Sequence, residues 1–305
     1  MDKLVKSDDS GVRLDRWLKE NLQDITYVEI QKSIRTGQVR VDGGRKKPNY
    51  RVNKGEKIKF PSRYAKTNID TKKKIQQHSN LNLNDIIIYD DESMLVINKP
   101  YGLSTQGGTK VKHHIDGLLS RENEDEKKYR LVHRLDKYTS GALIIAKKRD
   151  SASFYTKKFR DKQIKKTYLA LTQGEPDEKI GVINFPLENP NLKKTSKKDD
   201  QPQEAMTQYE VIATTKDKIS LIKLEPFTGR KHQIRKHLSM INTPIIGDVK
   251  YGYDNKPDHI EKRFYLHSHT VEFPCYSNGK NIQVKAQIPK YFEEAMKALE
   301  IQFYE

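Results

Sequence analysis

Asp136 is the residue whose surroundings most suggest chemistry. It follows Arg134 by two positions and comes shortly before an apolar run, Ala142–Ala146, which predicts a buried strand. A carboxylate at the entrance of a buried strand is partly desolvated and needs cationic partners to stay charged. Arg134 is long enough to reach past its neighbours towards a ligand. The alternative is a structural aspartate in a turn completed by Thr139 and Ser140.

A second polar cluster lies between Thr228 and Leu238. The Thr-Gly turn is predicted to start a helix, with His232 and Arg235 on a face separate from the inward-packing residues. An arginine at the beginning of a helix is unfavourable with the helix dipole unless an anion is close. Arg230 is therefore predicted to pair with a carboxylate or phosphate, and Asp136 is the candidate. The other basic residues form either a solvated face or a contact surface for an RNA backbone.

Two further positions are candidates for a site. Tyr168 lies on a predicted strand, residues 164–171, where it is either an ordinary strand aromatic or a ligand contact. Lys99 follows a predicted strand where a sheet edge is expected to open towards a cleft. Adjacent His113 and His114 are poorly placed to bind one ion together, and no metal site is predicted.

The elements that position these residues fall into two units joined by a linker. We predict a small basic module at residues 1–62, a lysine-rich linker at 63–80 and a larger domain at 81–305. In the module, helices are predicted at 12–22 and 28–34 and strands at 39–41 and 57–60. In the larger domain, strands are predicted near 86–89, 94–98, 142–146, 164–171, 206–212, 219–226 and 266, and helices at 151–162, after 228 and at 291–299.

Charge favours a polyanionic partner. The 305 residues include 58 Lys and Arg against 41 Asp and Glu, a net charge of +17, and residues 1–75 carry +10 of it. Such a surface favours nucleic-acid binding through counterion release. No apolar run approaches the ~20 residues that span a bilayer, and no signal peptide is visible, so a soluble cytoplasmic protein without a membrane partner is expected. The single Cys275 excludes an intramolecular disulfide.

The first unit resembles a known RNA-binding module. The runs Val12–Leu18 and Ile30–Gly43 are similar to the small module named after the fourth protein of the small ribosomal subunit. In such modules the basic helices face structured RNA. The resemblance implies RNA contacts from Arg13, Arg16, Lys32 and Arg35.

The rest of the chain resembles the RluA-type pseudouridine synthases. The similarity lies in His133–Gly141, Lys166–Ala170 and Thr228–Arg235, in that order, with Asn98–Pro100 also in place. With the module it covers nearly the whole chain, and it is closest to bacterial members that modify large-subunit ribosomal RNA. The resemblance implies an α+β fold with a mixed, largely antiparallel central sheet, flanking helices, a positively charged cleft and no cofactor.

The resemblance also implies roles for the candidate residues. Asp136 would act as nucleophile on the ribose or the base, or assist a glycal route, and Arg230 would keep it charged. Tyr168 would stack on the uracil and help to move the C5 proton. Because the target uridine must be flipped out of structured RNA, Arg134 would fill the space it leaves. Lys99, His232 and Arg235 complete the predicted RNA-binding set.

Two other functions remain open from the sequence. One is a synthase of the same family that acts on transfer RNA, and the other is a non-catalytic RNA-binding factor for ribosome assembly. Lys231, Lys236 and the segment 202–203 depart from the family pattern, which affects substrate contacts rather than the core chemistry. The expected partner is large-subunit ribosomal RNA or a pre-ribosomal particle, bound by a monomer.

Overall fold

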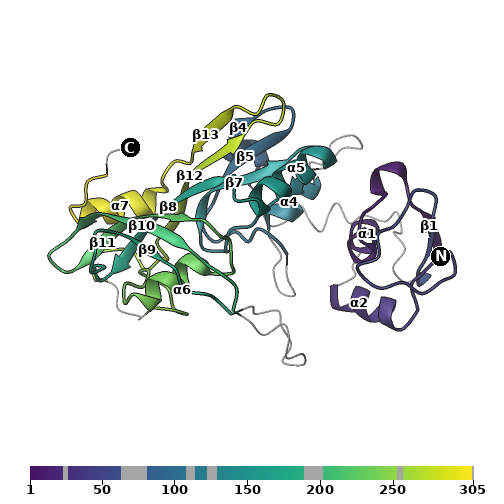
Figure 1. Ribbon diagram of the computed structural model, residues 1–305, viewed down its shortest axis with the longest axis horizontal. Coiled ribbons are helices and arrows are strands. Elements are labelled where there is room, and N and C mark those ends of the chain that lie inside the picture. The colour runs from purple at the N-terminus through teal and green to yellow at the C-terminus, as the bar shows by residue number, and fades with distance from the viewer. Residues whose placement is uncertain are drawn as a thin grey trace. The chain divides into compact units, whose positions relative to one another are not determined.

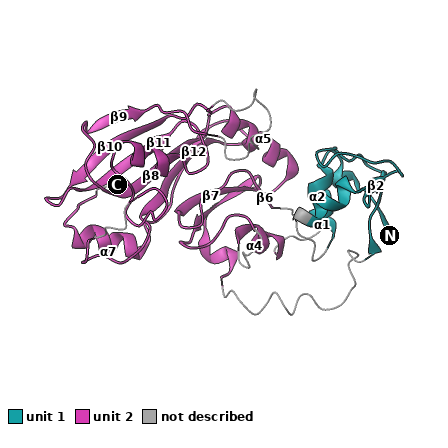
Figure 2. Ribbon diagram, turned by 90° about the horizontal axis from the view of Figure 1, so that it is seen from below, with its two compact units in different colours: residues 1–78 teal, residues 79–305 magenta. Residues whose placement is uncertain are grey.

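The computed structural model describes residues 1–22, 27–62, 81–107, 114–121, 129–188, 202–252 and 257–303 (Figure 1). The chain divides into two compact units, residues 1–78 and 79–305 (Figure 2). The predicted linker, residues 63–80, lies outside the described residues. In the described part of the chain, no helix is long and apolar enough to cross a membrane.

The first unit packs two helices on a small antiparallel sheet. Trp17 and Leu18 of the first helix are fully buried, and the Trp17 ring nitrogen donates to the Asp9 carboxylate over 3.3 Å. The amphipathic spacing of the sequence thus correctly predicted both helices. The elements are β1 (Asp2–Leu4), η1 (Ser7–Asp9), α1 (Leu14–Asn21), α2 (Tyr27–Arg35), β2 (Arg40–Val41) and β3 (Lys57–Lys59), with strand order β1-β3-β2.

The second unit is built on a ten-stranded sheet. Its main path runs β4-β5-β7-β12-β8-β11-β10-β9, with β13 paired to β12 and β6 to β7. Among these strands only β12 and β7 pair in parallel, so the predicted mixed, largely antiparallel fold is confirmed. The strands are β4 (Ile87–Asp90), β5 (Met94–Lys99), β6 (Arg130–Leu131), β7 (Ser140–Ala146), β8 (Lys165–Gln173), β9 (Ile180–Ile183), β10 (Thr207–Thr214), β11 (Ile219–Pro226), β12 (Leu266–Pro274) and β13 (Asn281–Lys285).

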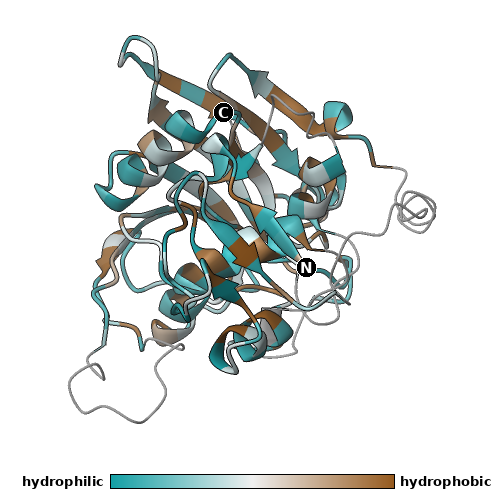
Figure 3. Cartoon of the chain, turned by 90° about the vertical axis from the view of Figure 1, so that its right-hand side faces the viewer, coloured by the Kyte–Doolittle hydropathy of each residue, from teal (hydrophilic) through white to brown (hydrophobic). Residues whose placement is uncertain are grey.

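Helices cover both faces of this sheet. On one face, α4 and α6 pack against alternate strand residues such as Leu95 and Ile97. On the other face, α5 and α7 pack against the strand residues that alternate with these. Figure 3 shows this alternation of hydrophobic and hydrophilic residues along strands and helices. The helices are η3 (Leu83–Ile86), α4 (Ile115–Arg121), α5 (Arg149–Arg160), α6 (Gln233–Met240) and α7 (Lys290–Ala298).

The strand β7 begins beside β12 through a close backbone contact. Gly141 has a φ of +107°, and a Cβ at this position would overlap the carbonyl of Ser268. Only glycine tolerates both conditions without strain. This contact fixes the end of the loop between β6 and β7, which carries Asp136.

Candidate active site

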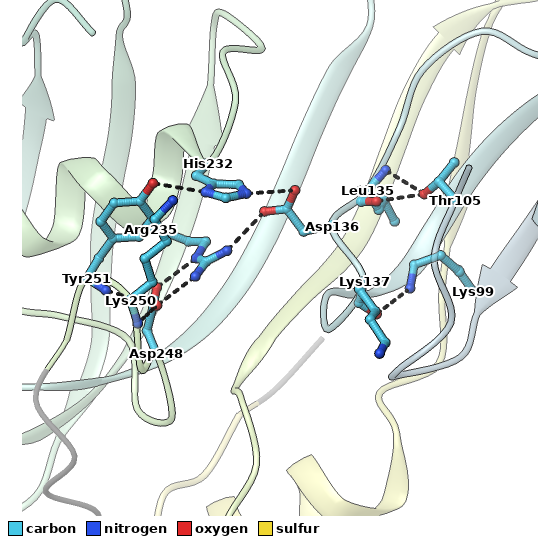
Figure 4. A network of polar contacts seen from close by, with 10 residues as sticks. All are labelled: Lys99, Thr105, Leu135, Asp136, Lys137, His232, Arg235, Asp248, Lys250 and Tyr251. Carbon is cyan, nitrogen blue, oxygen red and sulfur yellow. Dashed lines mark hydrogen bonds and ion pairs between the residues drawn. The ribbon is translucent and has the colours of Figure 1, made fainter. Parts of the chain in front are cut away.

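The loop that carries Asp136 is anchored on both sides of the carboxylate. The buried Leu135 donates its N–H to the Thr105 hydroxyl oxygen over 3.1 Å, and that hydroxyl donates to the Leu135 carbonyl over 2.6 Å. After Asp136, the Thr139 N–H donates to the Asp136 carbonyl over 3.1 Å. Figure 4 shows the Asp136 side chain between this anchor and a cluster of cationic residues. The backbone therefore presents the carboxylate in a fixed direction.

Lys99 is a further anchor of the same loop. It is 0% exposed, and its ammonium donates to the carbonyls of Pro100, Leu103 and Lys137 over 3.0, 2.8 and 3.2 Å. Burial lowers its pKa to about 7, and the Asp136 charge partly opposes that shift. The sequence analysis predicted an RNA contact for Lys99, but in this structure its ammonium lies inside the protein and donates to backbone carbonyls.

Replacing Lys99 by Met is expected to lower the free energy of unfolding by about 3 kcal/mol, because three backbone carbonyls lose their common donor. Urea denaturation of the purified protein measures this loss. Lys290→Met, on the exposed surface of α7, is the matched control and should change the stability by less than about 0.5 kcal/mol. Equal stability of the two variants would contradict the anchoring role.

The cation closest to Asp136 is Arg235. Its Nη1 lies 3.5 Å from Asp136 Oδ2, while its Nε and Nη2 each donate to Asp248 over 2.7 Å. The guanidinium also lies over the rings of Tyr251 and Phe264, with its Cζ 5.0 and 5.2 Å from their centroids. Arg235 is thus held rigidly by a second carboxylate and approaches Asp136 without a tight hydrogen bond. The carboxylate oxygens of Asp136 remain accessible to a ligand.

Asp248 is the residue that orients this arginine. It is 1% exposed, so burial alone would raise its pKa, but the Arg235 guanidinium and the N–H groups of Lys250 and Tyr251 hold the pKa below its usual value. Asp248 was not among the site residues predicted from the sequence. The sequence feature that could have identified it is a carboxylate in a turn that closely follows a basic helix.

His232 is the second group beside Asp136. Its Nε2 lies 3.7 Å from Asp136 Oδ1, and its Nδ1 shares a 3.0 Å hydrogen bond with the Tyr251 hydroxyl. Burial lowers the pKa of His232, the Asp136 carboxylate opposes that shift, and Arg235 reinforces it. Both His232 and Arg235 were predicted to contact RNA, and the structure places them beside the Asp136 carboxylate.

The expected ion pair between Arg230 and Asp136 is not formed. Arg230 is exposed, and its Nε donates to the Glu204 carbonyl over 3.0 Å. The reason is the position of the helix: α6 begins at Gln233, after His232 in a left-handed conformation with φ of 55°. The arginine in the first turn is therefore Arg235, and Arg235 rather than Arg230 is the arginine that lies next to Asp136.

Tyr168 faces Asp136 across a cavity of about 250 Å³. The lining includes Asp136, Lys166, Tyr168, Thr228, Ile234 and Leu266, and we call it the Tyr168 cavity. Burial raises the pKa of Tyr168 to about 12, a hydrogen bond with Ser268 opposes the shift and the Asp136 charge adds to it. The phenol is thus protonated near neutral pH. Its ring, among apolar neighbours, is suited to packing against a flat base.

A second cavity, of about 370 Å³, also reaches Asp136. It is lined by Ser104, Gln106, Tyr138, Val249 and Phe264 among others, and Arg134 borders both cavities. Arg134 is exposed next to the carboxylate. The structure thus brings together Asp136, Tyr168 and Arg134, with Arg230 at the rim of the first cavity.

The predicted RNA-contact residues of the first unit lie on the surface of its helices and at the N-terminal end of α1. Arg13, Arg16, Lys32 and Arg35 are all exposed. Arg13 donates twice to the buried Asp15, over 3.1 and 2.7 Å, and Arg16 pairs with Glu20 over 2.9 Å. Within the described ranges, no group of three or more acidic, histidine or cysteine side chains could hold a metal ion.

Comparison with known proteins identifies the family. The profile of the RNA pseudouridylate synthase family matches residues 93–240, which span the Asp136 loop, Tyr168 and the beginning of α6. A protein of Rickettsia bellii named ribosomal large subunit pseudouridine synthase C is 32% identical over 92% of this chain and 95% of its own length. The chain belongs to the RNA pseudouridylate synthase family. The synthase is therefore an isomerase, and its residues 12–58 match the S4 domain.

Other relatives agree with this assignment. Synthases of the same name from Rickettsia conorii and Vibrio vulnificus are 35% and 30% identical, over 92% and 97% of this chain and 95% of each relative. The solved structure of human RNA pseudouridylate synthase domain containing 4 superposes with a TM-score of 0.61 at 27% identity, over 72% of this chain and 95% of that one. The resemblance seen in the sequence is thus confirmed for both units.

Proposed function

We propose that this synthase converts specific uridines of large-subunit ribosomal RNA into pseudouridine, with Asp136 as the reacting group. The observation that carries the proposal is the Asp136 carboxylate, held in place by its loop and open to the Tyr168 cavity, in a chain similar along nearly its whole length to large-subunit enzymes. The reaction breaks the N1–C1′ bond, turns the base and joins C5 to C1′. As an isomerisation it needs no cofactor.

The residues around Asp136 supply the remaining requirements of this reaction. Arg235, fixed by Asp248, places a positive charge next to the carboxylate and orients it, which is the position we first expected of Arg230. Asp136 then attacks the ribose C1′ or the base, or removes a ribose proton on a glycal route. Tyr168 packs against the uracil. Arg134, exposed beside the carboxylate, occupies the space that the flipped nucleotide leaves.

The substrate class is tested by comparing RNAs labelled with tritium at C5 of uridine, since pseudouridine formation releases that hydrogen. We expect release from large-subunit ribosomal RNA and none above background from transfer RNA or small-subunit RNA. Release only from transfer RNA would favour the second candidate substrate. No release from any of these RNAs would favour a non-catalytic assembly factor. A factor that only binds RNA would not need a carboxylate such as Asp136 next to a rigidly held arginine.

The S4 unit is proposed to hold the RNA through its basic helices. Replacing Lys32 and Arg35 by Gln is expected to raise the Kd for RNA on the order of 10-fold and to reduce the salt dependence of binding, because two phosphate contacts are lost. The rate at saturating enzyme should stay unchanged. Filter binding at several salt concentrations, with single-turnover assays, measures both.

The matched control removes the same charge from the second unit. Lys290 and Lys297 are both exposed on α7. If their replacement by Gln weakens binding as much as the change in α2, total charge rather than the S4 unit determines affinity. We further propose that the protein acts as a monomer in the cytoplasm, on free ribosomal RNA or on a pre-ribosomal particle.

A further inference from the structure

Lys166 is a cation in the Tyr168 cavity that the proposed reaction has not yet used. It lies two residues before Tyr168 on β8, so both side chains project from the same face of the sheet. Its stem is half-buried and its side chain lines the cavity together with Asp136. Among the described residues, its ammonium has neither a hydrogen-bond nor an ion-pair partner.

The contrast with Lys99 shows why this is unusual. Lys99 is fully buried and donates to three backbone carbonyls, whereas Lys166 is half-buried and donates to none of the described residues. A partly desolvated ammonium without acceptors is costly in the free protein. Such a group is expected to gain its acceptors from the ligand that fills the cavity.

The location of Lys166 favours the base over the RNA backbone as that ligand. Arg134, Arg230 and Lys231 are exposed around the same cavity and can meet phosphates at its rim. Lys166 instead shares its wall with the Tyr168 ring and with apolar side chains of Ile234 and Leu266. A flat uracil fits such a wall, while a hydrated phosphate would lose its water there.

We propose that the Lys166 ammonium donates a hydrogen bond to a carbonyl oxygen of the uracil while that base is detached from the ribose. This inference rests on the proposed function of Asp136. When the N1–C1′ bond breaks, its electron pair leaves with the uracil, which becomes an anion with its charge shared by N1, O2 and O4. A cationic donor positioned at the base stabilises such charge more than it stabilises the neutral uridine.

The rest of the step balances without any co-reactant. The electron-poor C1′ either bonds to the Asp136 carboxylate or becomes part of a glycal after C2′ gives a proton to that carboxylate. C5 of the turned uracil then bonds to C1′, and the carboxylate leaves or returns the proton to C2′. The C5 proton is lost and N1 gains one, so Lys166 keeps its own proton throughout and acts as a catalytic residue by contact with the base.

The charge of Lys166 makes the reaction sensitive to pH. Burial lowers its pKa to about 8, so the ammonium loses its proton, and the donor its charge, as the pH rises through that value. Burial lowers the pKa of the neighbouring His133 to about 3 and raises the pKa of Tyr168 to about 12, both outside the range from pH 6 to 9. Lys99, with a pKa of about 7, titrates inside this range but does not line the cavity, so its contribution is the same in wild type and in the Lys166 variants. The other titratable and charged groups around the cavity are Asp136, His232, Arg134, Arg230, Lys231 and Arg235.

Single-turnover assays of the full chain with a large-subunit RNA transcript test the proposal. Lys166→Met is expected to lower the rate at saturating enzyme by about 10²- to 10³-fold, as loss of one oxyanion donor does, with the Kd changed less than about 3-fold. The matched control is Lys165→Met, because Lys165 is the exposed neighbour on the opposite face and should change neither quantity. Lys166→Arg should keep most of the activity and lose the decline above pH 8.

Two results would overturn the proposal. One is a Kd raised at least about 10-fold with an unchanged saturated rate, which would assign Lys166 to a phosphate contact. The other is a saturated rate equal to that of wild type at every pH. If Lys166→Met melts below the assay temperature, Lys166→Gln gives the same comparison. Asp136→Asn, assayed in parallel, separates the proposed function of Asp136 from the proposed role of Lys166. Activity in Asp136→Asn refutes the proposed function. If Asp136→Asn is inactive and Lys166→Met is fully active, only the role of Lys166 is refuted.

Discussion

Asp136→Asn is expected to abolish pseudouridine formation, with a fall in the single-turnover rate on the order of 10⁴-fold or more. The amide keeps the size and the polar surface of the side chain but can neither form a bond to the ribose or base nor accept a proton. The loop itself should be preserved, because Thr105 and Lys99 hold its backbone rather than its carboxylate. Tritium release from C5-labelled RNA measures the rate.

Binding provides the control for this variant. Asp136→Asn removes a negative charge beside the cleft, so its Kd for RNA should be equal to or lower than that of wild type. An inactive variant that also failed to bind RNA or melted early would point to a structural aspartate in a turn. Retained activity at more than about a tenth of wild type would exclude Asp136 as the reacting group.

Arg235→Met is expected to produce the second-largest effect. The change removes the cation next to Asp136 and leaves the buried Asp248 without its bidentate partner. We expect the rate to fall by about 10²- to 10³-fold and the unfolding free energy by about 3 kcal/mol. Arg235→Lys keeps the charge but not the bidentate geometry, so it should recover only part of the rate and only part of the unfolding free energy. Rates and urea denaturation curves should be measured below the melting temperature of each variant.

Arg230→Met is the matched comparison, because it removes the other arginine of the same segment. Arg230 contacts a backbone carbonyl and lines the rim of the cavity, so its loss should cost less than about 10-fold in rate and leave stability unchanged. If Arg230→Met were the more damaging of the two, the ion pair expected from the sequence alone would form in the complex with RNA, and the assignment of Arg235 would be wrong.

The sequence predicted the elements well because their signals are local. A continuous apolar run predicted the buried strand Ala142–Ala146, and helical spacing predicted α1, α5 and α7 within a few residues. It also located Asp136 correctly at the entrance to a strand. The beginning of α6 was missed, since the Thr228-Gly229 turn looked like a helix start while the left-handed His232 delays the helix to Gln233.

Partnerships across the fold could not be predicted in the same way. The bond of Arg235 to Asp248 depends on how a turn after α6 folds back on the helix, which no spacing in the sequence encodes. Lys99 was predicted to contact RNA because a sheet edge was expected to open towards a cleft at this position. Its burial follows from three carbonyls that converge from two separate loops. The Arg235–Asp248 bond and the burial of Lys99 both concern long side chains, whose direction is set by tertiary contacts.

The measurement that tests the central claim most directly is a map of pseudouridines in ribosomal RNA, made by carbodiimide modification and primer extension. Cells that lack this protein are compared after rescue with wild type or with Asp136→Asn. We predict that defined stops in large-subunit RNA disappear in the deletion strain and return only with wild type. Return of the stops with Asp136→Asn, or an unchanged map of large-subunit RNA in the deletion strain, would contradict the account.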